Sequence, residues 1–305
     1  MSESSLTAPV CYRHPSRETY VRCTRCDRPI CPDCMRDASV GHQCPECVAE
    51  GRRATRPVRT VFGGGAAGRE GYVTKALIGI NVLLMLLSIY SDRGGDSVAG
   101  GSGFGGLLGG STPLTNWGAV LGLFQPGPLS PAEGVAAGEF YRLFTAMFLH
   151  YGLIHLAMNM WALWVLGRSL EATLGPLRFL ALYLIAGLGG NVAAYLFSRP
   201  DAATAGASTA IFGLFAALFI IMRRLGRDTS AVIPILVINL VFTFAVPGIS
   251  IAGHLGGMVT GAVMAFALAY APRSRRTLVQ FAGGALIGVA LIGLTLLRTA
   301  SLVAG

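Results

Sequence analysis

The sequence has 305 residues, of which 53% are hydrophobic and only 13% are charged, and its formal net charge is +9. About a quarter of the residues of a soluble domain are charged. The composition therefore excludes an ordinary soluble enzyme or binding domain and predicts a polytopic membrane protein. All seven cysteines fall between Cys11 and Cys47. Their confinement to one polar segment favours metal ligands in a reducing compartment over disulfides.

The N-terminal module, residues 1–48, arranges its cysteines and one histidine as four pairs. The pairs are Cys11-x-x-His14, Cys23-x-x-Cys26, Cys31-x-x-Cys34 and Cys44-x-x-Cys47. Eight ligands suffice for two tetrahedral, structural zinc ions. Because the spacer between the second and third pairs is short, we expect a cross-brace, with pairs one and three on one zinc and pairs two and four on the other. The pattern resembles a B-box-type zinc finger. His42 is a spare ligand, and we expect it to be a surface residue.

The module contains too few apolar residues to fold without metal. Nothing in it indicates catalysis. Because a membrane domain follows, we favour a cytosolic protein as its partner, and nucleic acid is the less favoured alternative. A third interpretation is a solvated basic face near anionic lipid. The arginines on which the nucleic-acid and lipid interpretations rest are Arg13, Arg17, Arg22, Arg25 and Arg28.

A basic, glycine-containing linker, residues 49–71, precedes the first apolar segment. We expect it to lie against the anionic surface of the membrane, where each Arg contributes about 1 kcal/mol. Its arginines are Arg52, Arg53, Arg56, Arg59 and Arg69.

Seven apolar segments predict an all-α membrane bundle over residues 72–298, with a short tail at 299–305. We expect six core spans and a seventh, C-terminal one. Pro247-Gly248 divides a long uncharged stretch into two helices of nearly the roughly 20 residues that a bilayer needs. The glycine-rich residues 94–110 are expected to form no stable helix. The predicted spans are residues 72–90, 145–167, 177–197, 208–222, 231–246, 250–270 and 278–297.

The arginines predict an orientation with the N-terminus in the cytoplasm and the C-terminus outside, in a bacterial plasma membrane. This choice satisfies the positive-inside rule. The cytoplasmic loops then hold Arg168, Arg178, Arg223, Arg224, Arg227, Arg273, Arg275 and Arg276, against Arg93, Arg142, Arg199 and Arg298 on the opposite side.

Polar side chains from three spans fall at one depth in this topology. They are Ser208, His254 and the i,i+4 pair of His155 and Asn159. An ionisable group within a membrane is a functional-site hypothesis by default. A serine becomes a nucleophile beside a general base. Since no Asp or Glu lies within a predicted span, a Ser-His dyad is indicated rather than a triad. Taken singly, the serine would more often bond its own helix, and the histidine is as often structural.

The polar motifs resemble, in order and spacing, those of the rhomboid family of intramembrane serine proteases, over about residues 72–297. The resemblance implies Ser208 as nucleophile and His254 as general base. It implies His150, Asn159 and the Ser208 amide as the oxyanion hole, with His155 in support. Glu171 would be a structural hydrogen-bonding residue. The motifs are Tyr141-Arg142, His150, His155-x-x-x-Asn159, Gly206-x-Ser208 and His254-x-x-Gly257-x-x-x-Gly261.

The resemblance further implies cleavage of transmembrane substrate proteins in or near the bilayer, reached laterally past the fifth span, with no cofactor needed for catalysis. Two residues depart from the family pattern: Thr209 stands where glycine is common, and Tyr141 where tryptophan is usual. Neither removes a catalytic group. The alternatives are a non-catalytic rhomboid-like protein that binds and routes membrane clients, and a transporter, whose expected inverted repeats we do not find.

Overall fold

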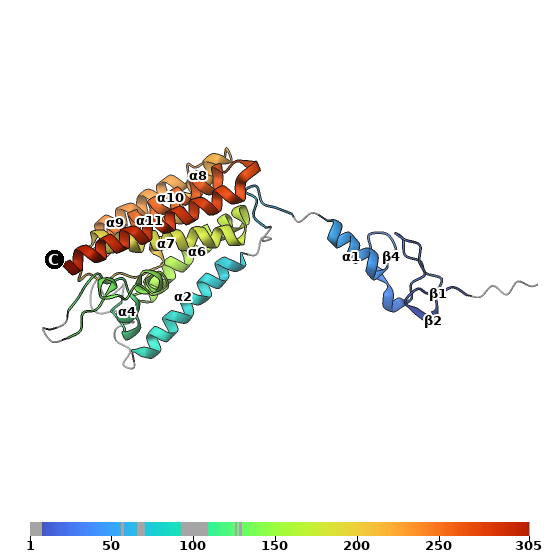
Figure 1. Ribbon diagram of the computed structural model, residues 1–305, viewed down its shortest axis with the longest axis horizontal. Helices are drawn as coiled ribbons and strands as arrows, with labels where there is room; N and C mark the ends of the chain where they lie inside the picture. The colour runs from blue at the N-terminus through green and yellow to red at the C-terminus, as the bar shows by residue number, and fades with distance from the viewer. Residues whose placement is uncertain are drawn as a thin grey trace, which may run out of the picture. The chain divides into compact units, whose positions relative to one another are not determined.

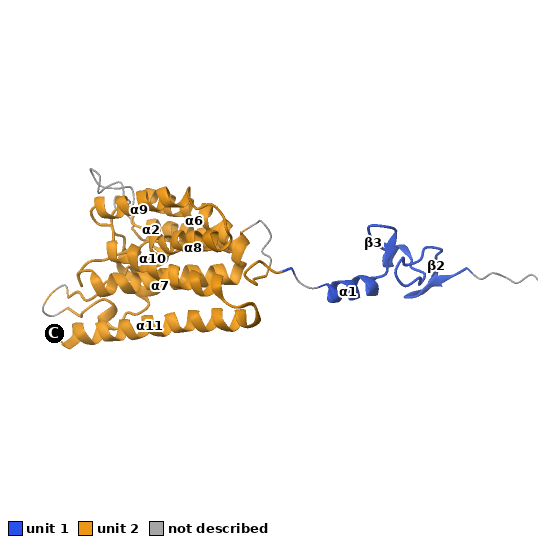
Figure 2. Cartoon of the chain, turned by 90° about the horizontal axis from the view of Figure 1, so that it is seen from above, with its two compact units in different colours: residues 1–58 blue, residues 59–305 orange. Residues whose placement is uncertain are grey.

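The computed structural model describes residues 8–55, 58–65, 71–92, 109–125, 127 and 130–304. The chain divides into two compact units, Met1–Val58 and Arg59–Gly305 (Figure 2). Arg56, Arg69 and most of the glycine-rich stretch at 94–110 lie outside the described residues. Each unit is considered by itself.

Unit 1 is a small module built from two hairpins and one helix. Strand β1 (Val10–Cys11) pairs with β2 (His14–Glu18), and β3 (Arg36–Asp37) with β4 (His42–Gln43), both antiparallel. Its core consists of Ile30 and six buried cysteines. Helix α1 (Pro45–Ala54) begins after Cys44 and continues into the residues expected to form the linker. A core made of thiols agrees with the expectation that apolar packing alone does not hold this unit.

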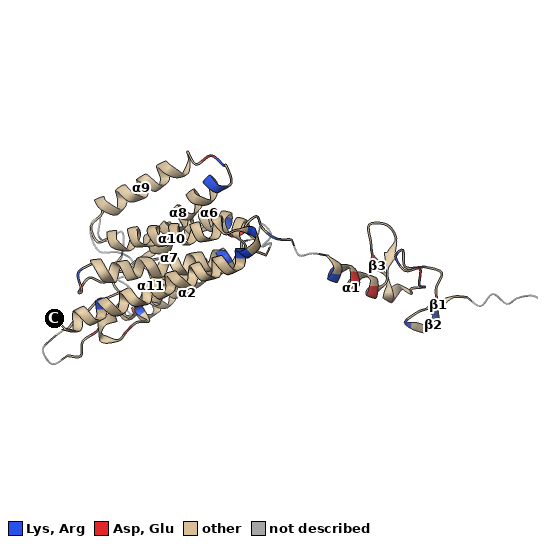
Figure 3. Ribbon diagram, turned by 45° about the horizontal axis from the view of Figure 1, so that its top comes forward, with Lys and Arg blue, Asp and Glu red and all other residues tan. Residues whose placement is uncertain are grey.

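Unit 2 is a bundle of helices, as the composition predicts (Figure 1). Helix α7 is central, packed by α8, α10 and α11, and α2 lies against α6. The helix bodies are almost free of charge, and most basic positions of the unit lie at one end of the bundle (Figure 3). The principal helices are α2 (Tyr72–Ser91), α6 (Leu153–Leu174), α7 (Pro176–Phe197), α8 (Ser208–Arg224), α9 (Val232–Ala245), α10 (Ile251–Tyr270) and α11 (Arg276–Ala304).

Within the described residues, four helical stretches are long and apolar enough to cross a membrane, or up to five if a bent pair counts as one span. The four are Tyr72–Ser91, Pro176–Phe197, Ile251–Tyr270 and Arg273–Ala304. Helix α9, with 14 residues, is apolar but shorter than a span. Helix α8 has 17 residues, so the expectation of a short helix at this position is correct.

The predicted start of the second span at residue 145 is wrong. Here the chain forms two short helices, α5 (Arg142–Thr145) and η4 (Ala146–Phe148), and then bends by 88° before α6 begins at Leu153. Gly152 supplies the bend with a φ of 147°, which L side chains rarely adopt. Most of the apolar residues before the bend are buried in the protein, so hydropathy alone did not separate them from a span. The last helix also continues to Ala304, beyond its predicted end.

Two polar side chains anchor chain segments at one end of the bundle. Glu171 is fully buried near the C-terminus of α6, and its carboxylate accepts hydrogen bonds from the Val73 and Thr74 amides and the Thr74 hydroxyl. It thereby satisfies free donors in the first turn of α2, where negative charge is favourable. Gln280 of α11 donates hydrogen bonds to the carbonyls of Phe62 and Leu268. The end of the predicted linker is thus part of unit 2.

Helices α8 and α10 approach each other closely because glycines face one another at their contact. A Cβ added to Gly257 would overlap with the carbonyl of Thr209, and one at Gly261 would overlap with the backbone of Gly213. A Cβ at Gly213 would lie 2.8 Å from the Gly257 carbonyl oxygen. This is the small-xxx-small packing that lets membrane helices come into backbone contact.

We predict that Gly257→Ala destabilises the bundle, because the added methyl group forces α8 and α10 apart. Overpacking of this kind costs about 1–3 kcal/mol. Thermal unfolding of the full chain in detergent measures the change. Gly288→Ala on α11 is the matched control, since nothing lies within 4 Å of a Cβ there. If both variants unfold at the wild-type temperature, the close approach is not required.

Candidate active site and metal centres

Ser208 is the first residue of α8 and follows a loop held against the rest of the bundle. The Gly206 amide donates to the Ala146 carbonyl at 2.9 Å, and Thr204 pairs with Val120. Gly206 has a φ of 146°. A Cβ at this position would lie 3.0 Å from the His155 ring and 3.3 Å from Ser208 Oγ. Only glycine therefore suits this position, both in conformation and in space.

His254 lies in the first turn of α10 and faces the serine. Its Nε2 is 2.8 Å from Ser208 Oγ, although the two residues are 46 positions apart in sequence. Phe212, one turn after Ser208 on α8, stacks on the imidazole with ring centroids 4.2 Å apart. The side chain of Ser250 caps α10 by accepting from the Gly253 amide. The serine and the histidine thus meet in hydrogen-bonding geometry within a largely buried site.

The second ring nitrogen of His254 has a partner that the sequence analysis did not identify. Its Nδ1 is 2.8 Å from the hydroxyl of Thr243, which is buried on α9. Ser208 and Phe212 are four residues apart on one face of α8. This spacing could have indicated that the phenyl ring lies beside the partner of the serine. No comparable signal points to Thr243, because a threonine in an apolar helix ordinarily bonds its own backbone.

His150 and His155 lie beside the residues that precede α8, and Asn159 follows His155 by one turn on α6. The rings of His150 and His155 meet edge to face at 5.0 Å. The Ala207 amide donates to His150 Nε2 at 3.4 Å, so this histidine lies against the backbone that precedes the serine. Asn159 donates one amide hydrogen to the His155 carbonyl at 2.8 Å, which leaves a second hydrogen on the same nitrogen. The oxyanion role of these residues stays a prediction.

Thr209 is buried in the packing between helices. A Cβ at Gly190 of α7 would lie 2.6 Å from the Thr209 Cβ, and one at Gly253 would lie 3.2 Å from its Cγ2. The side chain therefore fills space left by glycines on two neighbouring helices.

Arg142 lies in the connection that precedes α6, where it is buried. Its guanidinium donates to Glu139 at 2.7 Å and to the carbonyls of Asn116 and Ala119. Burial alone would raise the pKa of Glu139, but hydrogen bonds from Arg142 and the Gly134 amide bring it below its ordinary value. Tyr141 stacks on Trp117 at 4.8 Å. Arg142 therefore holds the connection in place. Glu171, the other predicted structural residue with a charged side chain, lies at the end of α6 opposite His155.

The cysteine unit brings its ligands together as two groups. One contains Cys11, His14, Cys31 and Cys34, and the other Cys23, Cys26, Cys44 and Cys47. The ligand atoms of each group lie within 4.8 Å of one another. The predicted cross-brace of pairs one and three, and of pairs two and four, is confirmed as an arrangement of side chains. His42 belongs to neither group and lies 3.4 Å from Asp37.

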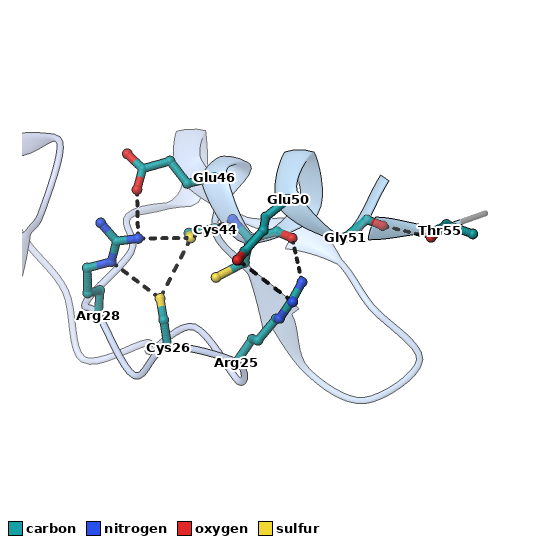
Figure 4. A network of polar contacts seen from close by, with 9 residues as sticks. Arg25, Cys26, Arg28, Cys44, Glu46, Glu50, Gly51 and Thr55 are labelled. Carbon is teal, nitrogen blue, oxygen red and sulfur yellow. Dashed lines mark hydrogen bonds and ion pairs between the residues drawn. The ribbon is translucent and has the colours of Figure 1, made fainter. Parts of the chain in front are cut away.

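Both groups suit a tetrahedral metal, with three sulfurs and one nitrogen in the first and four sulfurs in the second. Arg28 donates to Cys26 Sγ at 3.3 Å and pairs with Glu46 at 2.6 Å (Figure 4). Its side chain and backbone lower the pKa of Cys26 and so favour the thiolate that binds metal. Arg25 donates to the Cys47 carbonyl and pairs with Glu50 (Figure 4).

The bundle thus places a serine beside a histidine across a helix contact lined by glycines. The Rhomboid domain model matches residues 137–271, which include all the polar motifs. The chain belongs to the rhomboid family.

Relatives with this similarity occur in Bacillus subtilis and in Arabidopsis thaliana. Rhomboid protease GluP of Bacillus subtilis (strain 168) is 42% identical over 142 residues, covering 44% of this chain and 27% of the relative. Putative rhomboid protease YdcA of the same organism is 36% identical over 138 residues, covering 44% and 69%. RHOMBOID-like protein 6, mitochondrial, of Arabidopsis thaliana is 35% identical over 156 residues, covering 48% and 50%. The match thus spans about a quarter of GluP and half of the plant protein.

Proposed function

We propose that this protein is an intramembrane serine endopeptidase that cleaves transmembrane proteins in or near the bilayer. The observation that carries the proposal is the 2.8 Å contact between Ser208 Oγ and His254 Nε2. Family membership and relatives named as rhomboid proteases support it.

In the proposed mechanism His254 removes the hydroxyl proton of Ser208 as the oxygen attacks the scissile carbonyl carbon. The tetrahedral oxyanion accepts hydrogen bonds from the Ser208 amide and from the side chains of His150 and Asn159. The imidazolium then protonates the leaving amine as the C–N bond breaks, which leaves an acyl-enzyme on Ser208. Water, deprotonated by His254, hydrolyses this ester and restores the serine. No metal or organic cofactor enters these steps.

A non-catalytic client-binding protein is the alternative function. Such a protein has no need of a serine hydroxyl within hydrogen-bonding distance of an imidazole. The presence of this pair favours the enzyme. A covalent probe of serine nucleophiles distinguishes the two functions without knowledge of the substrate.

We predict that Ser208→Ala and His254→Ala each abolish cleavage of a single-span substrate reconstituted with the protein in vesicles. The double variant should be no less active than either single one, because the two residues act as a unit. A fluorophosphonate probe should label the wild type and neither variant. Thermal unfolding is the control for the fold. Labelling that persists in Ser208→Ala, or full cleavage without His254, would contradict the dyad.

The oxyanion donors should matter without being indispensable. Removal of one donor typically lowers the rate by about 10²–10³-fold. We predict that Asn159→Ala retains weak, measurable cleavage with an unchanged unfolding temperature, and that His150→Ala is similarly impaired. Wild-type rates in both variants would mean that other groups stabilise the oxyanion.

The topology that we propose places the N-terminus and unit 1 in the cytoplasm of a bacterium and the C-terminus outside. The gathering of arginines at one end of the bundle supports this orientation by the positive-inside rule (Figure 3). The linker arginines then face anionic lipid, and unit 1 is free to bind a cytosolic protein. The boundaries proposed are a zinc module at 1–48, a linker at 49–71, a peptidase domain at 72–298 and a tail.

We further propose that unit 1 holds two structural zinc ions. When bound, zinc would supply folding free energy to a unit that has almost no apolar core besides its thiols. The two quartets and the Arg28 contacts support this proposal.

Metal analysis of the full chain, purified in detergent without added metal, should give two zinc ions per molecule. Cys34→Ser and Cys47→Ser should each lose at least one ion, because each removes a ligand from a different quartet. His42→Ala is the control and should keep both. Fluorophosphonate labelling of Ser208 should be unaffected, since that chemistry lies in unit 2. A wild-type content of one ion would refute the two-site arrangement.

A further inference from the structure

We propose that Thr243 is a positioning residue that fixes His254 in the tautomer able to accept the Ser208 proton. The inference rests on the proposed protease function and adds to it a hydroxyl group from a third helix. No predicted site residue lies on α9, so neither the motifs nor the proposed dyad includes Thr243.

The geometry of Thr243 is that of a buried hydroxyl between two partners. Its Oγ1 lies 2.8 Å from His254 Nδ1 and 2.9 Å from the Asn239 carbonyl oxygen, one turn earlier on α9. The side chain is only 2% exposed. Both contacts are well within hydrogen-bonding distance.

Counting protons assigns a direction to each hydrogen bond. A threonine hydroxyl has one hydrogen to donate, and a carbonyl oxygen can only accept. The Asn239 carbonyl therefore takes the hydroxyl hydrogen, as is usual for a threonine within a helix. The hydroxyl oxygen then accepts from His254, so Nδ1 carries the hydrogen. Nε2 is left with its lone pair toward Ser208 Oγ at 2.8 Å, as a general base requires.

The other tautomer would break this chain of hydrogen bonds. With the hydrogen on Nε2, the imidazole would donate to the serine and could not remove its proton. The Thr243 hydroxyl would also have to turn from Asn239 to donate to Nδ1. In a largely buried site, the lost bond is not replaced by water. The arrangement thus favours the reactive tautomer before substrate arrives.

Thr243 also has a role after proton transfer. The imidazolium formed then has hydrogens on both nitrogens, and the Thr243 oxygen remains the acceptor for Nδ1–H. An aspartate takes this position in a Ser-His-Asp triad. A hydroxyl is neutral and stabilises the cation less than a carboxylate does, so its removal should impair the reaction without abolishing it. Two other described residues contact the ring: Ser208 at Nε2 and the stacked Phe212.

The hydrogen bond between Thr243 and His254 also has a consequence for α9. Among the described residues of this helix, only Val232 and Thr243 are buried. Thr243 therefore attaches the C-terminal end of a sparsely packed helix to the catalytic base. A displacement of α9 at this end would remove the acceptor from Nδ1.

The test compares Thr243→Val, which removes the hydroxyl but keeps the shape, with Thr243→Ser, which keeps the hydroxyl. We expect Thr243→Val to lower kcat by about tenfold or more, with KM within about twofold of wild type, for a reconstituted single-span substrate. The rate of fluorophosphonate labelling at Ser208 should fall in parallel. Thr243→Ser should restore most of both rates. Thr295→Val, which removes a similarly buried, back-bonded hydroxyl from α11, should match the wild type.

A spectroscopic measurement tests the assignment on the unaltered protein. The chain has five histidines, so ¹⁵N-histidine spectra allow His254 to be assigned by difference from His254→Ala. We expect the wild-type spectrum to show His254 with hydrogen on Nδ1 and Thr243→Val to lose that preference. Hydrogen on Nε2 in the wild type, or wild-type rates in Thr243→Val, would overturn the proposal. If instead Ser208 is neither labelled nor needed for cleavage, the proposed protease function itself fails.

Discussion

The contact between α8 and α10 is the constraint on which the rest of the site depends. Lipid provides little hydrophobic drive for helices to associate, so close packing of small residues must hold them together. Gly257 and Gly213 allow backbone to meet backbone, which brings the first turns of both helices to a common place. Ser208 and His254 occupy those turns. Their contact therefore follows from glycine packing a few residues away.

Four polar groups of the site form one connected chain in a largely apolar setting. Ser208 forms a hydrogen bond with His254, His254 with Thr243, and Thr243 with the Asn239 carbonyl. A buried polar group without a partner is costly. A neutral chain that ends on a helix carbonyl satisfies its members without bringing a carboxylate into the bilayer, which would be costly. The carboxylates that the fold does use, Glu139 and Glu171, serve as hydrogen-bond acceptors away from the dyad.

The two units are stabilised by different interactions. The bundle is held by helix packing and by buried anchors such as Arg142 and Glu171. The cysteine unit has a core of thiols with a single buried isoleucine, so metal takes the place of apolar packing in the proposed zinc-bound form. This division agrees with the proposal that the bundle carries the chemistry and that the cysteine unit binds a cytosolic partner.

The sequence by itself determined the helical bundle, most of the helix limits and the division of the Cys and His ligands into two groups. These features depend on local signals: apolar runs, the Pro247-Gly248 break and ligand pairs with a short spacer. Only the tertiary structure decided the bend before α6, since a buried apolar run and a membrane span have the same hydropathy. The same holds for the Thr243 partner of His254, because whether a helical threonine bonds beyond its own backbone depends on which helix packs against it. That neighbour is set by the register of three helices, which no local pattern in the chain records.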